Sequence, residues 1–255
     1  LEEGINGQMI TLYDQGNHLP LMWTQLIPAT LEGKALHNVQ NTMFAALITY
    51  AMETRIENIR QGLQTFDTSF FQVPGRLNVF DELPFKVILD YGHNPVAVRC
   101  MVDLARRMEV KGRRICILAA PGDRRDEDIA RIAEYAAEGD FAHYILRQDD
   151  KARGREEGEV PRLMEQVMLS HGITPEQISV IPSEPEALDY GLKMARPDDL
   201  LLAFGDNCTR CWKQIIRFGE EVKLALSEGV QDSQDYVLAL PMLEATLEFP
   251  DSELI

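Results

Sequence analysis

KVILDYGHNPVAVRCMVDLARRM, at residues 86–108, contains the pattern that decides the fold of this chain. Residues 86–90 form a short run with an apolar centre, which is typical of a strand buried on both faces of a sheet. A polar loop follows, and the apolar residues between about 95 and 108 recur with the period of a helix. A buried strand followed by a helix predicts one half of a β-α-β unit.

The same alternation continues along most of the chain. Further strand-like runs occupy residues 76–80, 114–119, 142–146, 178–181 and 200–204, and further helical patterns occupy residues 126–138, 159–171, 184–195 and 209–218. Alternation over this length predicts an α/β fold with a mostly parallel sheet that helices cover on both faces. Ligands of such sheets bind beyond the carboxyl ends of the strands, so ligand-binding residues are expected in the loops that follow the strands.

The residues before position 75 follow a different pattern. A strand-like run at 8–13 precedes a polar turn and a second apolar run, and a break at 73–75 suggests a domain boundary. One helix is expected from Leu36 and a second over 55–65, together forming an antiparallel pair. The apolar spacing predicts that the first helix buries one stripe, made of Leu36, Val39, Met43, Leu47 and Tyr50.

The composition is that of an acidic globular protein. The 255 residues include 25 Lys and Arg against 41 Asp and Glu, a net charge of −16, which disfavours nucleic acid and anionic membranes as partners. No apolar run reaches the roughly 18 residues of a membrane span. Four cysteines without a signal-peptide pattern suggest a cytoplasmic protein. Because the chain begins at Leu1, we expect it to be a fragment of a longer polypeptide.

The loop at 90–95, Asp-Tyr-Gly-His-Asn-Pro, follows a strand directly and precedes a helix. Its carboxylate can accept hydrogen bonds from ribose hydroxyls, and Asn94 or the helix N-terminus can donate to a phosphate. An equally good interpretation from spacing alone is that Asp90 and Asn94 only cap the helix.

Two further loops, at 121–126 and 147–159, carry acidic and basic side chains together. An amino-acid substrate needs both signs in one pocket, but solvated ion pairs on a surface give the same pattern. Other motifs are weaker. Cys208 and Cys211 form a single C-x-x-C without the second pair or the histidines that a zinc site needs, and no phosphate-binding G-x-x-x-x-G-K-[ST] motif is present.

Three segments, taken in order, resemble the Mur ligase superfamily of ATP-dependent amide-bond-forming ligases. They are His37-Asn38-Val39-Gln40-Asn41, Pro74-Gly75-Arg76 and Asp90-Tyr91-Gly92-His93-Asn94-Pro95. The resemblance implies a Rossmann-like C-terminal Mur ligase domain over 75–218. The end of the family's central ATPase domain would precede it at 1–74. The resemblance does not extend into residues 219–255, which the charge pattern predicts to be an acidic tail. A segment at 237–243 is expected to dock on the sheet domain or on a neighbouring subunit, unless it is a partly ordered terminus.

Within the superfamily the closest likeness is to the C-terminal module of the cyanophycin synthetase family. It lies in the segments 27–31, 122–126 and 153–159. The resemblance implies nucleotide binding by His37, Asn38 and Asn41 around adenine, Arg76 at the phosphates, Asp90 at the ribose, and His93 and Asn94 beside them. It implies amino-acid binding, with arginine favoured, by Asp123, Arg124, Asp149, Arg153, Arg155 and Glu159.

The implied reaction consumes ATP with Mg²⁺ and forms an amide bond on an acidic polymer or peptide through an acyl phosphate. The full-length enzyme would be a homo-oligomer. The family's phosphate-binding loop and metal ligands lie upstream of any segment in this chain, so the chain alone is expected to be inactive, and it offers no metal ligands and no identified catalytic residue. Two alternatives stay open: a folylpolyglutamate or peptidoglycan precursor ligase, and a non-catalytic Mur-like binding or assembly module.

Overall fold

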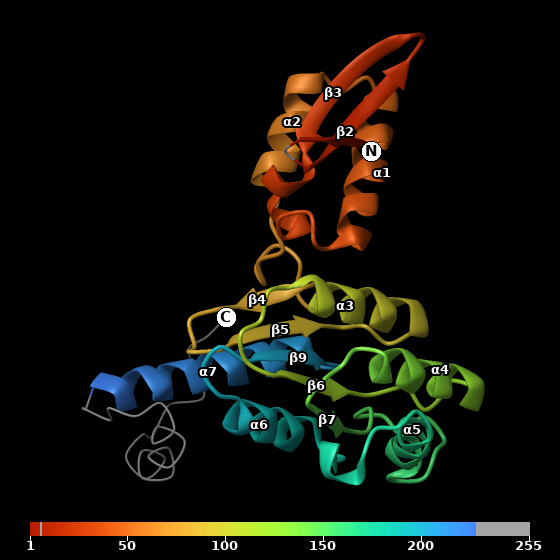
Figure 1. The fold of residues 1–255 in the computed structure, drawn as a ribbon, viewed down its shortest axis with the longest axis vertical. Helices are drawn as coiled ribbons and strands as arrows, with labels where there is room; N and C mark the ends of the chain where they lie inside the picture. The colour runs from red at the N-terminus through yellow and green to blue at the C-terminus, as the bar shows by residue number, and fades with distance from the viewer. Residues whose placement is uncertain (6, 228–255) are drawn as a thin grey trace.

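Residues 1–5 and 7–227 are described by the computed structural model, and they build two units with largely separate hydrophobic cores (Figure 1). The expected docking segment at 237–243 lies outside the described residues. None of the helices in the described part of the chain combines the length and the apolar content that a membrane span requires.

The N-terminal unit joins a small antiparallel sheet to two helices. Its strands are β1 (Glu2–Gly4), β2 (Gly7–Asp14) and β3 (Asn17–Trp23), and the short 3₁₀ helices η1 (Thr24–Leu26) and η2 (Pro28–Thr30) follow. The helices α1 (Leu36–Ala51) and α2 (Ile56–Thr65) then contact each other, and α2 contacts β3. The strand and the two helices expected here are therefore present, each within a residue of its predicted bounds.

The buried face of α1 differs from the predicted stripe. Leu36 and Leu47 were expected inside but are 40% and 52% exposed, while Met43 and Tyr50 are partly buried against the core. The buried positions of this helix are Val39, Thr42 and Ala46. The prediction is confirmed for Val39, Met43 and Tyr50 and was wrong for Leu36 and Leu47. Because α1 carries apolar side chains on more than one face, periodicity alone does not identify the face that meets the core.

The C-terminal unit is built on a six-stranded sheet with the order β4-β5-β9-β6-β7-β8. β4 runs antiparallel to β5, and the other neighbouring strands are parallel. The strands are β4 (Asn78–Phe80), β5 (Lys86–Asp90), β6 (Arg114–Leu118), β7 (His143–Leu146), β8 (Ile178–Val180) and β9 (Leu200–Phe204). The two edge strands, β4 and β8, have three residues each. The α/β fold with a mostly parallel sheet is confirmed.

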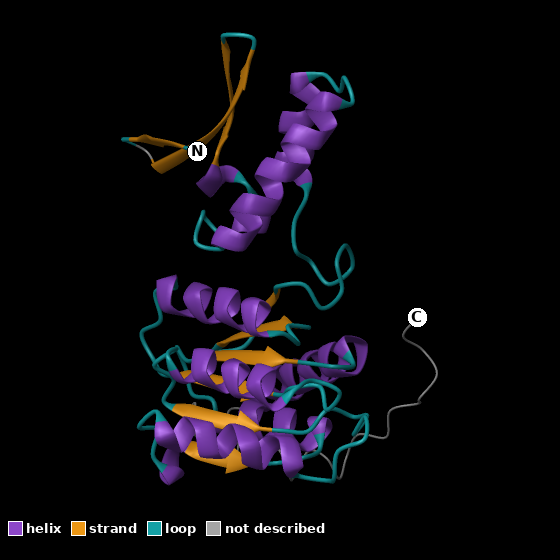
Figure 2. Ribbon diagram, turned by 90° about the vertical axis from the view of Figure 1, so that its right-hand side faces the viewer, coloured by secondary structure: helices purple, strands orange, loops and turns teal. Residues whose placement is uncertain are grey.

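Helices cover both faces of this sheet (Figure 2). One face packs against α3 (Pro95–Arg107), α4 (Asp126–Ala137) and α5 (Glu159–Ser170), and the other against α6 (Glu184–Met194) and α7 (Cys208–Ser227). Side chains alternate between the two cores along each strand: in β6, Cys116 and Leu118 face one core and Ile115 and Ile117 the other. This alternation is why the central strands read as continuous apolar runs.

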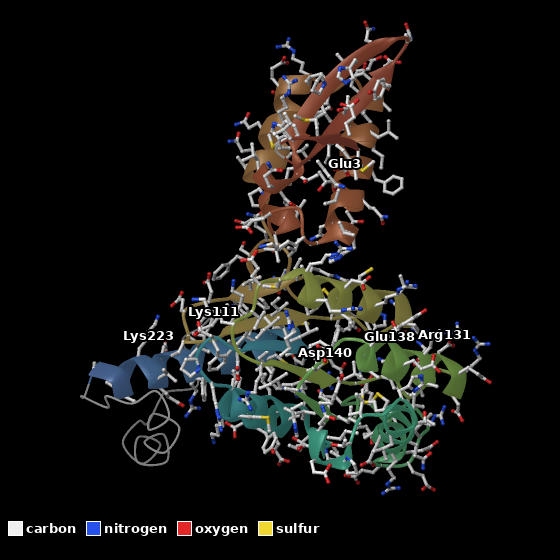
Figure 3. The ribbon with its side chains drawn as sticks, viewed as in Figure 1. Glu3, Lys111, Arg131, Glu138, Asp140 and Lys223 are labelled. Atoms are coloured by element: carbon white, nitrogen blue, oxygen red, sulfur yellow. The ribbon has the colours of Figure 1, made fainter. Side chains whose placement is uncertain are left out.

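Charged side chains lie on the outer surfaces of the helices. Figure 3 shows Arg131 of α4 and Glu138 just beyond it pointing away from the sheet, and both are exposed. Lys223 of α7 forms an ion pair with Glu82. α7 itself continues to Ser227, past the expected end at 218, so the residues where the acidic tail was expected to begin are helical. The domain limits at 75 and 219 remain predictions.

The segment that connects the two units is tied to the sheet by Asn78, whose side chain is fully buried. Its amide nitrogen donates to the carbonyl oxygens of Thr68 (2.8 Å) and Val73 (3.1 Å), and its oxygen accepts from the backbone nitrogen of Gly75 (2.6 Å). Gly75 has a φ of +71°, and a Cβ there would lie 2.4 Å from Cys208 Sγ. Both the backbone conformation and the lack of space therefore require glycine at this position.

Candidate functional site

A cavity of about 690 Å³ lies between the two units. α1 and α2 of the N-terminal unit line one side, and α3 with the end of β5 lines the other. Its volume falls within the range of about 300–1,000 Å³ that is typical of small-ligand sites. Five of the seven residues expected to bind a nucleotide line this cavity: His37, Asn38, Asn41, Arg76 and Asp90.

Asp90 is held rigidly at the carboxyl end of β5. Its two carboxylate oxygens accept hydrogen bonds from the backbone nitrogens of Leu77 (2.9 Å) and Gly92 (2.7 Å). Burial raises the pKa of this carboxyl above its usual value, while the two backbone donors and the nearby Arg76 act in the opposite direction. The carboxylate therefore stands at the strand end in a fixed orientation, and it borders the cavity.

The first turn of α1 presents polar side chains to the cavity. Asn38 donates to the carbonyl oxygen of Ala29 (2.7 Å), and its own oxygen accepts from the Asn41 amide (3.2 Å). Nδ1 of His37 is buried and has no hydrogen-bond partner within the described residues. Burial lowers the pKa of His37, and the carboxylate of Asp90 partly offsets that effect. An unpaired buried ring nitrogen at a cavity wall is available to a ligand.

Arg76 and His93 both lie against Tyr91. The guanidinium carbon of Arg76 is 5.6 Å from the centre of the Tyr91 ring, a distance typical of a cation–π contact. The His93 ring lies 4.6 Å from the same ring, centre to centre, and its Nδ1 is 3.2 Å from the Tyr91 carbonyl oxygen. His93 does not line the cavity. Tyr91 was not singled out from the sequence, although it lies within the quoted loop.

Asn94 occupies the N-cap of α3. Its side-chain oxygen accepts a hydrogen bond from the backbone nitrogen of Ala97 (3.0 Å), and Pro95 stands at the first helical position. This residue does not line the cavity, so the structure brings it to the helix end and not to the other expected nucleotide-binding residues. The contacts of Asn94 are therefore those of a helix cap, which was the alternative interpretation of its position before the helix.

The residues expected to bind the amino acid gather at the carboxyl ends of β6 and β7. Arg153 bridges two loops, because it pairs with Asp123 (3.0 Å) and with Asp149 (3.3 Å). Arg155 pairs with Asp126 and Glu159, both at 2.6 Å, and also donates to the carbonyl oxygens of Gly122 (3.1 Å) and Arg124 (2.9 Å). Arg124 contributes that carbonyl, and its side chain is exposed. The acidic and basic side chains of the two loops thus already form ion pairs with one another.

A second charged group lies deeper at the same end of the sheet and was not predicted. Arg147 is 1% exposed and forms ion pairs with Glu184 (3.2 Å) and Asp206 (2.8 Å). Arg210 pairs with Glu184 and with Asp150 (2.7 Å). The loops after β8 and β9 were marked from the sequence as ligand-facing, but Glu184 and Asp206 within them were not assigned. Their position directly after strands was the available signal.

The described residues fit neither a metal site nor a redox site. No group of three or more His, Cys, Asp or Glu side chains that could hold a metal ion occurs among them. Burial raises the pKa of Cys208 to about 11 and the pKa of Cys211 further still. Both thiols therefore stay protonated near neutral pH, unlike the reactive thiolate of redox C-x-x-C motifs.

Comparisons with known proteins identify the family of this chain. The family model described as "Mur ligase, glutamate ligase domain" matches residues 75–207. The chain is 33% identical to a cyanophycin synthetase of Nostoc sp., with 94% of this chain and 28% of that protein covered. It is also 33% identical to a cyanophycin synthetase of Crocosphaera subtropica, with 75% of this chain and 21% of that protein covered. The chain therefore spans less than a third of each of these relatives.

A solved structure shares the fold at low sequence identity. It is the UDP-N-acetylmuramoylalanyl-D-glutamyl-2,6-diaminopimelate–D-alanyl-D-alanyl ligase of Acinetobacter baumannii, with a TM-score of 0.55 and 17% identity. The alignment covers 85% of this chain and 45% of that one. The match extends over both units described above.

Proposed function

Since the chain belongs to the Mur ligase family, we propose that it is the C-terminal part of an ATP-dependent ligase that joins an amino acid to a carboxylate through an amide bond. One observation carries the proposal: residues from three separate segments, 37–41, 76 and 90, meet around one cavity at the carboxyl end of β5. That position is where open α/β sheets bind their ligands.

The cavity residues suit the parts of a nucleotide. The amides of Asn38 and Asn41 and the unpaired Nδ1 of His37 offer donors and acceptors to a purine base. The Asp90 carboxylate, held by two backbone donors, can accept from ribose hydroxyls. Arg76 supplies positive charge for the phosphates. The proposal leaves His93 and Asn94 out of this set, because their contacts are with Tyr91 and α3.

The proposed reaction has two steps. A carboxylate of the acceptor attacks the γ-phosphorus of ATP, the bond to the β-phosphate oxygen breaks, and ADP leaves. The amino group of the incoming amino acid then attacks the acyl phosphate, inorganic phosphate leaves, and the amine loses a proton. This type of catalysis depends on positioning and on charge neutralisation more than on an acid–base pair.

We propose arginine as the amino acid and an acidic polymer as the acceptor, because the cited relatives are cyanophycin synthetases. Asp123 and Asp149 already pair with one guanidinium, that of Arg153, which supports recognition of another such group by this loop pair. A homo-oligomeric state and a cytoplasmic location are part of the same proposal.

We expect the 255-residue chain alone to make no amide bonds. It has no G-x-x-x-x-G-K-[ST] motif, and the described residues contain no cluster that could hold Mg²⁺. The phosphate-binding loop and the metal ligands would come from elsewhere in a longer polypeptide. Phosphate release above background from the purified chain, given ATP, Mg²⁺ and an acidic acceptor, would contradict this expectation.

The nucleotide assignment is tested by calorimetric titration of the chain with ADP. Asn41→Ala and Arg76→Ala should each weaken ADP binding by about tenfold, the effect of losing roughly one good hydrogen bond. Asn207→Ala is the matched control, because Asn207 is exposed and lies outside the cavity, and its side-chain oxygen accepts a hydrogen bond from the backbone nitrogen of Arg210 (3.1 Å). Unchanged affinity in Asn41→Ala would argue against the assignment and favour a non-catalytic module.

The amino-acid assignment is tested on the full-length protein that carries this chain. Phosphate release is measured with ATP, an acidic peptide acceptor, and L-arginine, L-lysine, L-glutamate or L-aspartate in turn. Selective stimulation by arginine is expected. Selective stimulation by glutamate would replace arginine with the substrate class of the folylpolyglutamate ligases.

A further inference from the structure

The Arg147 side chain is the largest side chain that the sheet unit buries completely, and it joins two strand ends. From the end of β7 its nitrogens donate to the carbonyl oxygen of Phe204, the last residue of β9 (2.7 and 3.2 Å). One of its nitrogens also donates to the carbonyl oxygen of Gln148 (3.1 Å). A buried guanidinium must be neutralised where it stands, and the acids that neutralise Arg147 belong to other segments.

Those acids connect the buried guanidinium to the loop at 149–159. Asp206 accepts from Arg147 (2.8 Å), and the same oxygen accepts from the backbone nitrogen of Asp150 (3.3 Å). Glu184 accepts from the backbone nitrogen of Asp206 (2.6 Å) and pairs with Arg147 and Arg210. Arg210 in turn contacts both carboxylate oxygens of Asp150 (2.7 and 2.9 Å).

The far end of the loop is held by the residue next to Arg147. The side-chain oxygen of Gln148, which is 8% exposed, accepts from the backbone nitrogen of Gly158 (2.5 Å). Its own backbone nitrogen donates to the carbonyl oxygen of Pro182 (3.1 Å). Both ends of the loop are therefore fastened to β7, β9 and the start of α6, while the side chains of Arg153, Arg155 and Glu159 are more exposed.

We propose that Arg147, Asp206 and Arg210 are positioning residues that fix the loop at 149–159 relative to the sheet, so that the loop presents its charged side chains to the incoming amino acid. The proposal deepens the proposed function and rests on it, because that function assigns the loop to amino-acid binding. None of the three positioning residues needs to touch the substrate. They act through Asp150 and the backbone on either side of it.

The opposite end of the sheet supplies a matched control. Asp199, just before β9, is 3% exposed and pairs with Arg113 (2.7 Å), and it also accepts from the backbone nitrogens of Arg113 (2.6 Å) and Arg196 (2.9 Å). Asp199→Asn and Asp206→Asn each remove one negative charge from an ion pair with an arginine, and the two acids flank the same strand; Asp199 is the more buried of the two. Only Asp206 reaches the loop.

The first test is amide hydrogen exchange of the chain over residues 149–159. Asp206→Asn should speed exchange there by about tenfold, and Asp199→Asn by less than about twofold, because only the first opens the loop locally. Arg210→Gln, at a residue that is partly exposed and safer for folding, should match Asp206→Asn. Equal effects of Asp206→Asn and Asp199→Asn, or none in either Asp206→Asn or Arg210→Gln, would overturn the proposal.

The second test uses steady-state kinetics of the full-length protein with L-arginine and ATP. Asp206→Asn should raise KM for L-arginine by about tenfold and leave KM for ATP within about twofold, a split that general destabilisation does not produce. A parallel change of both KM values, or the same change in Asp199→Asn, would overturn the positioning role. If the wild-type protein does not use L-arginine, the proposed amino acid is wrong, while hydrogen exchange still decides whether these residues position the loop.

Discussion

At the scale of single residues, His37 and Asp90 form a coupled pair beside the cavity. Burial lowers the pKa of His37 below 6.5, and the Asp90 carboxylate acts against that effect. Asp90→Asn removes the opposing charge, so the pKa of His37 should fall further in a titration followed by NMR. His143 is the control, because burial and Arg113 lower its pKa and Asp90 is not among the causes. An unchanged His37 pKa in Asp90→Asn would contradict the coupling.

The lowered pKa of His37 also makes the stability of the chain depend on pH. Because the folded-state pKa of His37 is lowered, the unfolded chain binds a proton more readily than the folded chain below pH 6.5. The contribution of His37 to stability is therefore present above pH 6.5 and is lost as the pH falls through the folded-state pKa. Asp90→Asn should shift this loss to lower pH.

Asn78 carries a second residue-scale prediction. Its side chain satisfies three backbone groups of the connecting segment and is fully buried. Asn78→Ala leaves those groups unpaired and should lower the free energy of unfolding by about 2–4 kcal/mol. Asn207→Ala, which removes one exposed hydrogen bond, should cost only about 1 kcal/mol. Similar losses for the two variants in chemical denaturation would contradict the bridging role of Asn78.

At the scale of elements, the contact of Asn94 separates capping from nucleotide binding. Asn94→Ala should destabilise the chain by about 1 kcal/mol through loss of the α3 cap, and Asn94→Asp should largely retain that stability. ADP affinity measured by calorimetry should stay unchanged in both variants. A loss of ADP affinity in Asn94→Ala would show that Asn94 contributes to nucleotide binding.

The faces of α1 provide a further element-scale prediction. Leu47→Gln should change stability by less than about 0.5 kcal/mol, because that side chain is half exposed, whereas Val39→Ala should cost about 2 kcal/mol. Unfolding of the N-terminal unit can be followed through Trp23 in a Trp212→Phe background, since the chain has two tryptophans. A large loss of stability in Leu47→Gln would instead support the buried stripe that periodicity predicted for α1.

These elements also show what the sequence can and cannot predict. β5 and β9 were predicted at their observed bounds, because a strand covered on both faces has an unbroken apolar run at its centre that can be recognised without knowing its neighbours. The buried face of α1 could not be predicted, since it depends on which neighbours lie beside a helix that carries apolar side chains on more than one face. The burial of Arg147 could not be predicted either, because its partners Glu184 and Asp206 lie far along the chain and meet it only in the folded sheet.

At the scale of the whole molecule, the sheet unit is expected to fold without the N-terminal unit. Both cores of the sheet unit are formed by residues 77–225, apart from Ala35 and the partly buried Leu31 and Phe70. Residues 66–227, which keep the connecting segment that Asn78 and Trp212 contact, should therefore fold cooperatively without β1–β3, α1 and α2. Their NMR spectrum should be dispersed and close to the corresponding part of the whole chain. ADP binding should be lost, because α1 and α2 form one side of the cavity. A collapsed or aggregated product would contradict the independence of the sheet unit.

The short edges of the six-stranded sheet have a consequence for behaviour in concentrated solution. An exposed edge strand offers unpaired backbone groups on which another chain can add a strand, and long, flat edges invite aggregation. Here β4 and β8 have three residues each, and the longer strands β5, β9, β6 and β7 lie inside. The sheet thus gives another molecule little backbone to extend, and the net charge of −16 adds mutual repulsion between copies.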